Sequence, residues 1–157
     1  MIMTVIRGKR VDNGEWVYGM SELALWCKTR GIQNGECEMI DEINNDGSTF
    51  KIDPKSMGRY AGHNDKNGKR IFEGDILVLD GYAGCFLVYY DHKSDRFVMD
   101  NDKLVVDFSD YYRDSGEIIG NIHDNRDLWL GYLNLIDNGS TVNRLSQKAI
   151  NRISEIM

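Results

Sequence analysis

Short segments rich in β-branched and aromatic residues, each bounded by turn residues, occupy much of the chain. Segments 4–11 and 15–20 flank Asp12-Asn13-Gly14, where Asn and Gly tolerate the positive φ of a tight turn. Segments 37–43 and 48–53 flank a second turn at 44–47 in the same way. The pattern therefore predicts two N-terminal β-hairpins. We expect Pro54 to end the second hairpin and a single helical turn to follow it.

A denser series of apolar segments follows the turn Asp65-Lys66-Asn67-Gly68. These segments are four to six residues long and are separated by clusters of Asp, Gly, Ser and Asn. Short strands at such spacing are typical of a small closed or partly closed barrel. The predicted strands cover residues 69–72, 75–79, 85–90, 96–99, 104–108 and 117–122. The segment 21–35 fits neither a strand nor a helix clearly, and we expect irregular structure there.

The last residues change to a helical period. Five apolar positions recur at intervals of three or four, and Arg144, Lys148 and Arg152 form a second stripe. This pattern predicts a C-terminal amphipathic α-helix that begins at about Thr141. An isolated helix this short is marginal in water, so we expect its apolar stripe to mediate self-association; folding back onto its own domain is the alternative. The stripe is Val142, Leu145, Ala149, Ile153 and Ile156.

The length of 157 residues is that of one domain or of two small subdomains. The net charge of −6 is unevenly placed, because residues 71–140 carry 5 basic and 14 acidic side chains while residues 141–157 carry 3 and 1. The acidic stretch disfavours direct nucleic-acid binding, which depends on Lys and Arg. No apolar run approaches membrane-spanning length and no signal peptide is visible, so we expect a cytoplasmic protein without membrane contact.

No residue pattern indicates catalysis, a metal site or a bound cofactor. Cys27, Cys37 and Cys85 are not closely paired, and His63, His92 and His123 lie in separate segments. No nucleophile elbow or phosphate-binding glycine loop is present. The acidic residues of the middle segment are expected to form turns and a solvated face; they are Asp91, Asp95, Asp100, Asp102, Asp107, Asp110 and Asp114.

Tyr and Trp are more numerous than a small core needs, so some of these side chains must reach the surface. They could line a groove that binds peptide segments, as in many small β-barrels, because Tyr and Trp are enriched at interfaces. Alternatively, they pack the core and scatter over the surface, which is equally compatible with the sequence.

Three separated motifs occur in a characteristic order. They are IRGKRVDNGEWVYG at 6–19, RYAGHNDKNGKRIFEGDIL at 59–77 and EIIGNIHDNRDL at 117–128. Together they resemble the YopX protein family, a set of small proteins encoded mainly by phages and prophages. The chain departs from the family at Ala61, where a threonine is usual, and from about Gly131 it extends beyond the recognisable part.

The resemblance implies an intracellular phage or prophage protein with a mostly β fold that contains a small, partly closed SH3-like β-barrel. We expect a hairpin subdomain at residues 1–57, the barrel at 58–130 and a helical extension at 131–157. The resemblance implies no known chemistry, and Asp65 and Gly68 suit a bulged turn without any ligand. The other matched motif residues are also expected to be structural: Gly62, Gly74, Asp75, Gly120 and Asn121.

The sequence thus favours a non-enzymatic protein-binding or assembly module of phage origin. We expect a homo-oligomer with a host or phage protein as a further partner, in the cytoplasm of a bacterial host. One alternative is an acidic nucleic-acid mimic that occupies a host DNA-binding protein. A second alternative is a small hydrolase or nuclease whose acidic residues meet only in space.

Overall fold

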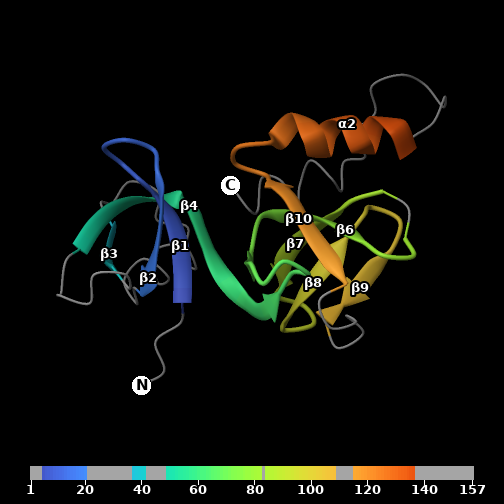
Figure 1. The fold of residues 1–157 in the computed structure, drawn as a ribbon, viewed down its shortest axis with the longest axis horizontal. Helices are drawn as coiled ribbons and strands as arrows, with labels where there is room; N and C mark the ends of the chain where they lie inside the picture. The colour runs from blue at the N-terminus through green and yellow to red at the C-terminus, as the bar shows by residue number, and fades with distance from the viewer. Residues whose placement is uncertain (1–4, 21–36, 42–48, 83, 109–114, 137–157) are drawn as a thin grey trace. The chain divides into compact units, whose positions relative to one another are not determined.

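The protein is mostly β, as predicted, in a computed structural model that describes residues 5–20, 37–41, 49–82, 84–108 and 115–136 (Figure 1). The chain divides into two compact units, residues 1–60 and 61–157. This division and the expected boundary after residue 57 both fall within one strand, residues 49–64. The described elements are β1 (Val5–Arg10), β2 (Trp16–Met20), β3 (Cys37–Asp41), β4 (Thr49–Asn64), β5 (Arg70–Phe72), β6 (Asp75–Leu79), β7 (Phe86–Asp91), β8 (Arg96–Asp100), β9 (Val105–Asp107), β10 (Gly116–Asn121) and α2 (Arg126–Ile136).

In the first unit, β1 and β2 form the first predicted hairpin. The strands are antiparallel, with Lys9 opposite Trp16. Gly14 takes a φ of +72° and donates its N–H to the carbonyl of Arg10 at 3.0 Å. The hairpin forms because a residue without a Cβ occupies the turn position that needs a positive φ.

β3 and β4 pair antiparallel, which confirms that the second pair of N-terminal segments forms a ladder. Their predicted turn at 44–47 lies outside the described residues, as does the segment 21–35. β1 pairs with β4 as well as with β2, so the pairings of β1, β2, β3 and β4 form a circuit. Ile6, Ile52 and Met57 are buried beneath it.

Strand β4 does not end at Pro54, and no helical turn follows it, so both of these predictions are wrong. Asp53 lies opposite Lys9 while Gly58 lies opposite Arg7, so residues 54–57 form a large bulge within a continuing strand. Pro54 is tolerated because a bulged residue need not donate to the ladder. The Ser56 hydroxyl replaces the missing pairing: Oγ accepts the N–H of Lys9 at 2.7 Å and donates to the carbonyl of Asp53 at 2.7 Å.

The second unit is built on an antiparallel sheet in the order β10-β6-β7-β8-β9. Its five strands confirm the dense strand series predicted from the sequence, and the remaining predicted strand, β5, pairs with β4. Within the described residues, β9 and β10 form the two outer edges of this sheet. The connections are short, because consecutive strands from β6 to β9 lie side by side.

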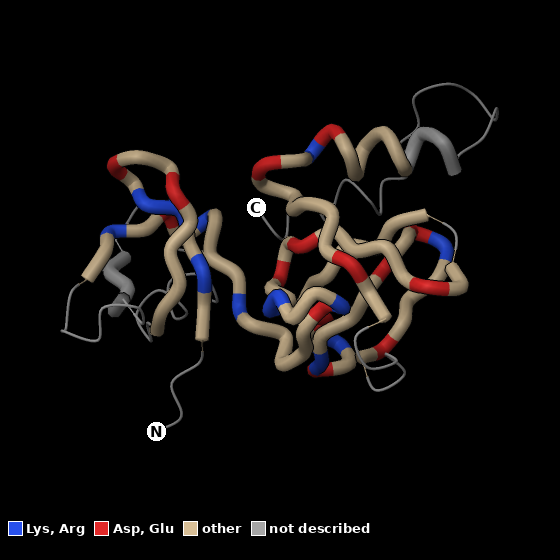
Figure 2. Tube along the Cα trace, viewed as in Figure 1, with Lys and Arg blue, Asp and Glu red and all other residues tan. Residues whose placement is uncertain are grey.

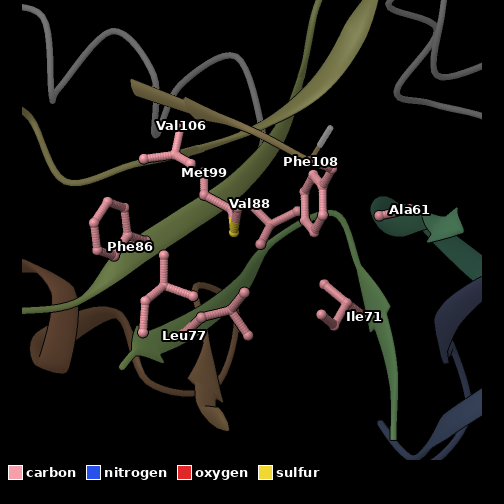
Figure 3. Packing of buried hydrophobic residues seen from close by; sticks show 9 residues of the cluster. Ala61, Ile71, Leu77, Phe86, Val88, Met99, Val106 and Phe108 are labelled. Atoms are coloured by element: carbon pink, nitrogen blue, oxygen red, sulfur yellow. The ribbon is translucent and has the colours of Figure 1, made fainter. Parts of the chain in front are cut away.

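Both faces of this sheet are covered by apolar side chains. Figure 3 shows Leu77, Phe86 and Met99 gathered on one face, where all three are fully buried. Ile76 adjoins Leu77 in sequence and Leu87 adjoins Phe86, so their side chains lie on the opposite face. There they pack with Trp129 of α2. Helix α2 begins before the helical extension expected at 131–157 and overlaps its first residues, and the helix expected from about Thr141 lies outside the described residues. No helix in the described part of the chain is long and apolar enough to cross a membrane.

The bulge in β4 gives a first testable prediction. Replacing Ser56, which is buried, by Ala removes the acceptor of the Lys9 N–H and should lower the free energy of unfolding by about 1–3 kcal/mol. The measurement is chemical denaturation of both proteins. The exposed neighbour Lys55 supplies the control, since Lys55→Ala should change stability by less than about 0.5 kcal/mol. Equal effects at the two positions would show that the hydroxyl does not hold the bulge.

Candidate functional site

The matched motif residues lie in three turns of the second unit. Gly62, Asp65 and Gly68 belong to the end of β4 and the turn to β5. Gly74 and Asp75 lie at the turn into β6, and the remaining two lie at the end of β10, before α2: Gly120 and Asn121. The first two turns are close in sequence and the third is distant, but all three adjoin β10 or its neighbour β6.

Asp65 is the centre of the first turn, and its side chain is only 1% exposed. Its Oδ1 accepts the N–H groups of Asn67 and Lys69, each at 2.9 Å. Its Oδ2 accepts the N–H of Ile118 in β10 at 3.2 Å, although Ile118 lies 53 residues further along the chain. Gly68 closes the turn with a φ of +79°. One carboxylate therefore shapes the turn and fastens it to β10.

Two further contacts join the same turn to β10. The N–H of Lys66 donates to the carbonyl of Gly116 at 2.8 Å. The ammonium of Lys66 lies 2.9 Å from a carboxylate oxygen of Glu117. Because this ion pair is exposed, its contribution to stability is small beside the buried bonds of Asp65.

Burial disfavours the charged form of Asp65, but the N–H groups of Lys69, Ile118 and Asn67 favour it more strongly. The pKa of Asp65 is therefore lowered from its ordinary value. A carboxylate with this pKa stays ionised at neutral pH. Both of its oxygens are directed at backbone amides of the protein itself.

The Gly74-Asp75 turn joins β5 to β6 and contacts β7 and the residue that follows β10. The N–H of Gly74 donates to the carbonyl of Val88 in β7, and its carbonyl accepts the N–H of Ile122, both at 2.8 Å. Gly74 has a φ of +90°, which a side chain would strain. Asp75 is buried and accepts the N–H of Phe72 through Oδ2 at 2.8 Å. This motif pair thus anchors the start of β6.

Gly120 and Asn121 shape the connection from β10 to α2. Asn121 Oδ1 accepts the N–H groups of His123 at 3.0 Å and Asp124 at 2.9 Å. The N–H of Asn125 donates to the Asn121 carbonyl at 2.7 Å. A Cβ on Gly120 would lie 2.6 Å from Asn125 Oδ1, so this close approach requires glycine. The closing motif therefore directs the chain into α2.

The acidic residues are distributed over the second unit rather than gathered at one point (Figure 2). Asp91 accepts the Ser94 hydroxyl at 2.7 Å, which holds the pKa of Asp91 below its ordinary value. Asp100 is buried and accepts the Tyr89 hydroxyl at 2.6 Å. Arg96 pairs with Asp107, and Tyr90 donates to Asp95. Asp110 and Asp114 lie outside the described residues.

His63 and Cys85 are shaped by burial in the described part of the chain. His63 stacks on Phe108 with ring centroids 4.8 Å apart, and burial lowers the pKa of His63. Burial raises the pKa of the Cys85 thiol to about 12, which disfavours the thiolate that a nucleophile needs. Across the described ranges, no group of three or more His, Cys, Asp and Glu side chains could hold a metal ion.

Sequence reasoning did not identify a basic and aromatic cluster in the first unit. The guanidinium of Arg7 lies 4.6 Å from the ring centre of Trp16, and the ammonium of Lys9 lies 5.4 Å from it. Arg7 is buried, which is unusual for an arginine. The sequence does contain a signal for this cluster. Arg7 and Lys9 alternate on one strand and Lys9 lies opposite Trp16, and side chains at such positions share one face of a hairpin. This arrangement stabilises the hairpin by cation–π contacts.

The bonds of Asp65 predict a specific pH dependence of stability. Because the folded pKa is lowered, the stabilisation is fully present above the unfolded value of about 4 and is lost as pH falls through the folded pKa. Asp65→Asn should therefore lower the free energy of unfolding by about 1–3 kcal/mol at pH 7, and the difference from wild type should shrink in acid. Denaturation at pH 7 and at pH 3 measures both effects.

The exposed residue Asp80 provides the matched control, because Asp80→Asn removes the same charge without a buried bond. It should change stability by less than about 0.5 kcal/mol at either pH. A difference between wild type and Asp65→Asn that stays constant from pH 7 to pH 3 would contradict the assignment.

The sequence model of the YopX protein family, described as YopX protein, matches residues 7–129. Among solved structures, the crystal structure of protein EF1440 from Enterococcus faecalis is similar, with 25% sequence identity and a TM-score of 0.50. The similarity covers 82% of this chain and 99% of that chain. No curated protein matches. The family match spans all three motifs and confirms the resemblance seen in the sequence: this chain belongs to the YopX protein family.

Proposed function

We propose that this protein is a non-enzymatic protein-binding or assembly module, encoded by a phage or prophage and active in the cytoplasm of a bacterial host. The observation that supports the proposal is that the motif side chains bind the backbone of the protein itself. The polar side chains of Asp65, Asp75 and Asn121 accept backbone N–H groups at turns. A catalytic carboxylate must instead direct an oxygen at a substrate. The motif thus supports a scaffold that presents a surface.

The form of the second unit supports this role. Family membership and the five short antiparallel strands favour an SH3-like barrel, a fold on which peptide partners often bind beside exposed aromatic side chains. Tyr82 is one such residue, because its side chain is exposed while its ring packs edge-on against the buried Phe86, with centroids 5.8 Å apart. A rigid aromatic group of this kind gives contact area at little entropic cost.

We propose that assembly proceeds through residues 141–157 and gives a homo-oligomer. Deleting residues 139–157 should lower the mass measured by light scattering, while the remaining chain keeps a cooperative melt, because the apolar stripe needs a partner surface. An unchanged mass with a much lower melting temperature would mean that the tail covers its own core. That result would overturn the assembly proposal.

The alternative of an acidic nucleic-acid mimic rests on the charge of residues 71–140 and on the proposed phage encoding. Both readings predict that the purified protein binds neither duplex nor single-stranded DNA at physiological salt, because binding depends on a concentrated basic surface. Gel shifts measure this directly. Submicromolar binding that weakens steeply with salt would contradict both readings and would direct attention to Arg7 and Lys9.

An affinity pull-down from the bacterial host separates the two readings. An assembly module should retain phage or host proteins that do not bind DNA. A nucleic-acid mimic should retain a DNA-binding protein, and added duplex DNA should release it, because the two ligands compete for one surface.

A further inference from the structure

Strand β10 forms an outer edge of the second unit's sheet within the described residues. On its inner side it pairs antiparallel with β6, where Ile118 lies opposite Leu77. An edge strand directs backbone N–H and C=O groups away from its own sheet, and a strand of another molecule can pair with them. Whether these groups of β10 already have partners therefore decides whether the sheet can extend across this edge.

The turn at residues 65–69 binds two backbone groups of β10. The Ile118 N–H donates to Asp65 Oδ2 at 3.2 Å, and the Gly116 carbonyl accepts the Lys66 N–H at 2.8 Å. Because the Ile118 N–H bonds to this turn, it points away from β6, and residues two apart in an antiparallel strand direct their backbone groups to the same side. The turn thus occupies the place that a further strand would take beside β10.

The turn that follows β10 binds the last residue of the strand in a similar manner. The Asn121 N–H donates to Asn125 Oδ1 at 3.1 Å, and the Asn121 carbonyl accepts the Asn125 N–H at 2.7 Å. A Cβ on Gly120 would lie 2.6 Å from that same Oδ1, so the glycine allows Asn125 to approach the strand. The second and the third sequence motif therefore each supply a turn that binds β10.

The part of β10 between these two turns is irregular and carries charge. The register against β6 shifts between Ile118 and Gly120, so Ile119 lies in a bulge, with its side chain 40% exposed. On the same strand, Glu117 lies 2.9 Å from the ammonium of Lys66. Bulges and charged side chains are two of the features by which proteins prevent edge strands from pairing. The whole length of β10 thus disfavours a partner strand.

We propose that the turn at 65–69 is an edge cap, which keeps β10 from pairing with the β10 strand of a second copy of this chain. Without the cap, the backbone groups of two copies would pair antiparallel about a two-fold axis and join the two sheets. The cap thereby restricts association of the protein to other surfaces. The inference goes beyond the proposed assembly through residues 141–157 and does not depend on it.

Two variants of the full-length chain open the edge. Asp65→Ala removes the acceptor of the Ile118 N–H. Lys66→Pro removes the N–H that binds the Gly116 carbonyl. Lys66 is the second residue of a turn that is closed by the Gly68 N–H and the Asp65 carbonyl, and this position favours proline, so the turn itself remains. Lys66→Pro therefore decides the outcome if Asp65→Ala does not fold.

Light scattering over a series of protein concentrations measures the effect. Each edge variant should roughly double in mass at concentrations at which wild type keeps its own mass, because two copies join about one axis. Wild-type mass throughout the range for the edge variants that fold would overturn the inference.

Ser56→Ala is the control for stability, because it removes a buried hydrogen bond in the first unit and leaves β10 unchanged. It should keep the wild-type mass. An equal rise in mass for Ser56→Ala and the edge variants would overturn the inference, because association would then follow from lowered stability alone.

Ile119→Lys tests whether the copies meet at β10. This residue lies near the middle of the strand, so the two lysines of a two-fold pair would face each other and repel. Adding Ile119→Lys to either edge variant should therefore restore the wild-type mass. Association that persists in the double variants would contradict the proposal, because the copies would then meet at another surface. Deleting residues 139–157 tests the tail separately, since that deletion leaves the turn at 65–69 in place.

Discussion

The second unit depends on one buried carboxylate, that of Asp65. Its three bonds to backbone N–H groups close the turn between β4 and β5 and fasten that turn to Ile118 in β10. Without these bonds, the buried carboxylate of Asp65 would be left unsatisfied, which costs more than the bonds themselves contribute. Other motif residues also hold the backbone through hydrogen bonds. Gly74 connects β7 to the segment after β10, and Asn121 directs the chain into α2.

In this arrangement the polar groups of the motif residues hold the fold. The motif residues lie at turns, where their polar groups serve the backbone of the chain. Some exposed apolar side chains lie away from these turns, among them Tyr82, Leu104 and Val105. Such a division is expected of a binding module, since a surface can change its partner without disturbing the turns that fix the strands.

The sequence predicted the strands well because their signals are local. β-branched and aromatic segments bounded by Asn, Asp and Gly became strands in both units, and the turn roles expected for Asp65 and Gly68 follow from neighbours within four residues. The hydrogen bond from the Ile118 N–H to Asp65 could not be predicted from local sequence, because the two residues are 53 positions apart. The prediction that Pro54 ends a strand failed for a related reason. The strand continues because a bulge accommodates Pro54, and this bulge depends on pairing with the distant strand β1.

The start of helix α2 was missed because turn residues directly precede it. Asp124 and Asn125 have the composition of a loop, and the helix that follows is stabilised by burial of Trp129 against Ile76 and Leu87, which are distant in sequence. The exposure of Leu104 and Val105 was equally hidden, since it depends on which strand is outermost. The tail stripe remains a sequence prediction.

Amide hydrogen exchange tests most directly whether the motif holds the fold. If Asp65 binds the turn as described, the amide protons of Asn67, Lys69 and Ile118 open only when the sheet unfolds. They should then exchange with the same opening free energy as an amide in the middle of β7, such as that of Val88. Exchange of Asn67 and Lys69 at the rate of an exposed turn, while Val88 stays protected, would contradict the structural role of the motif.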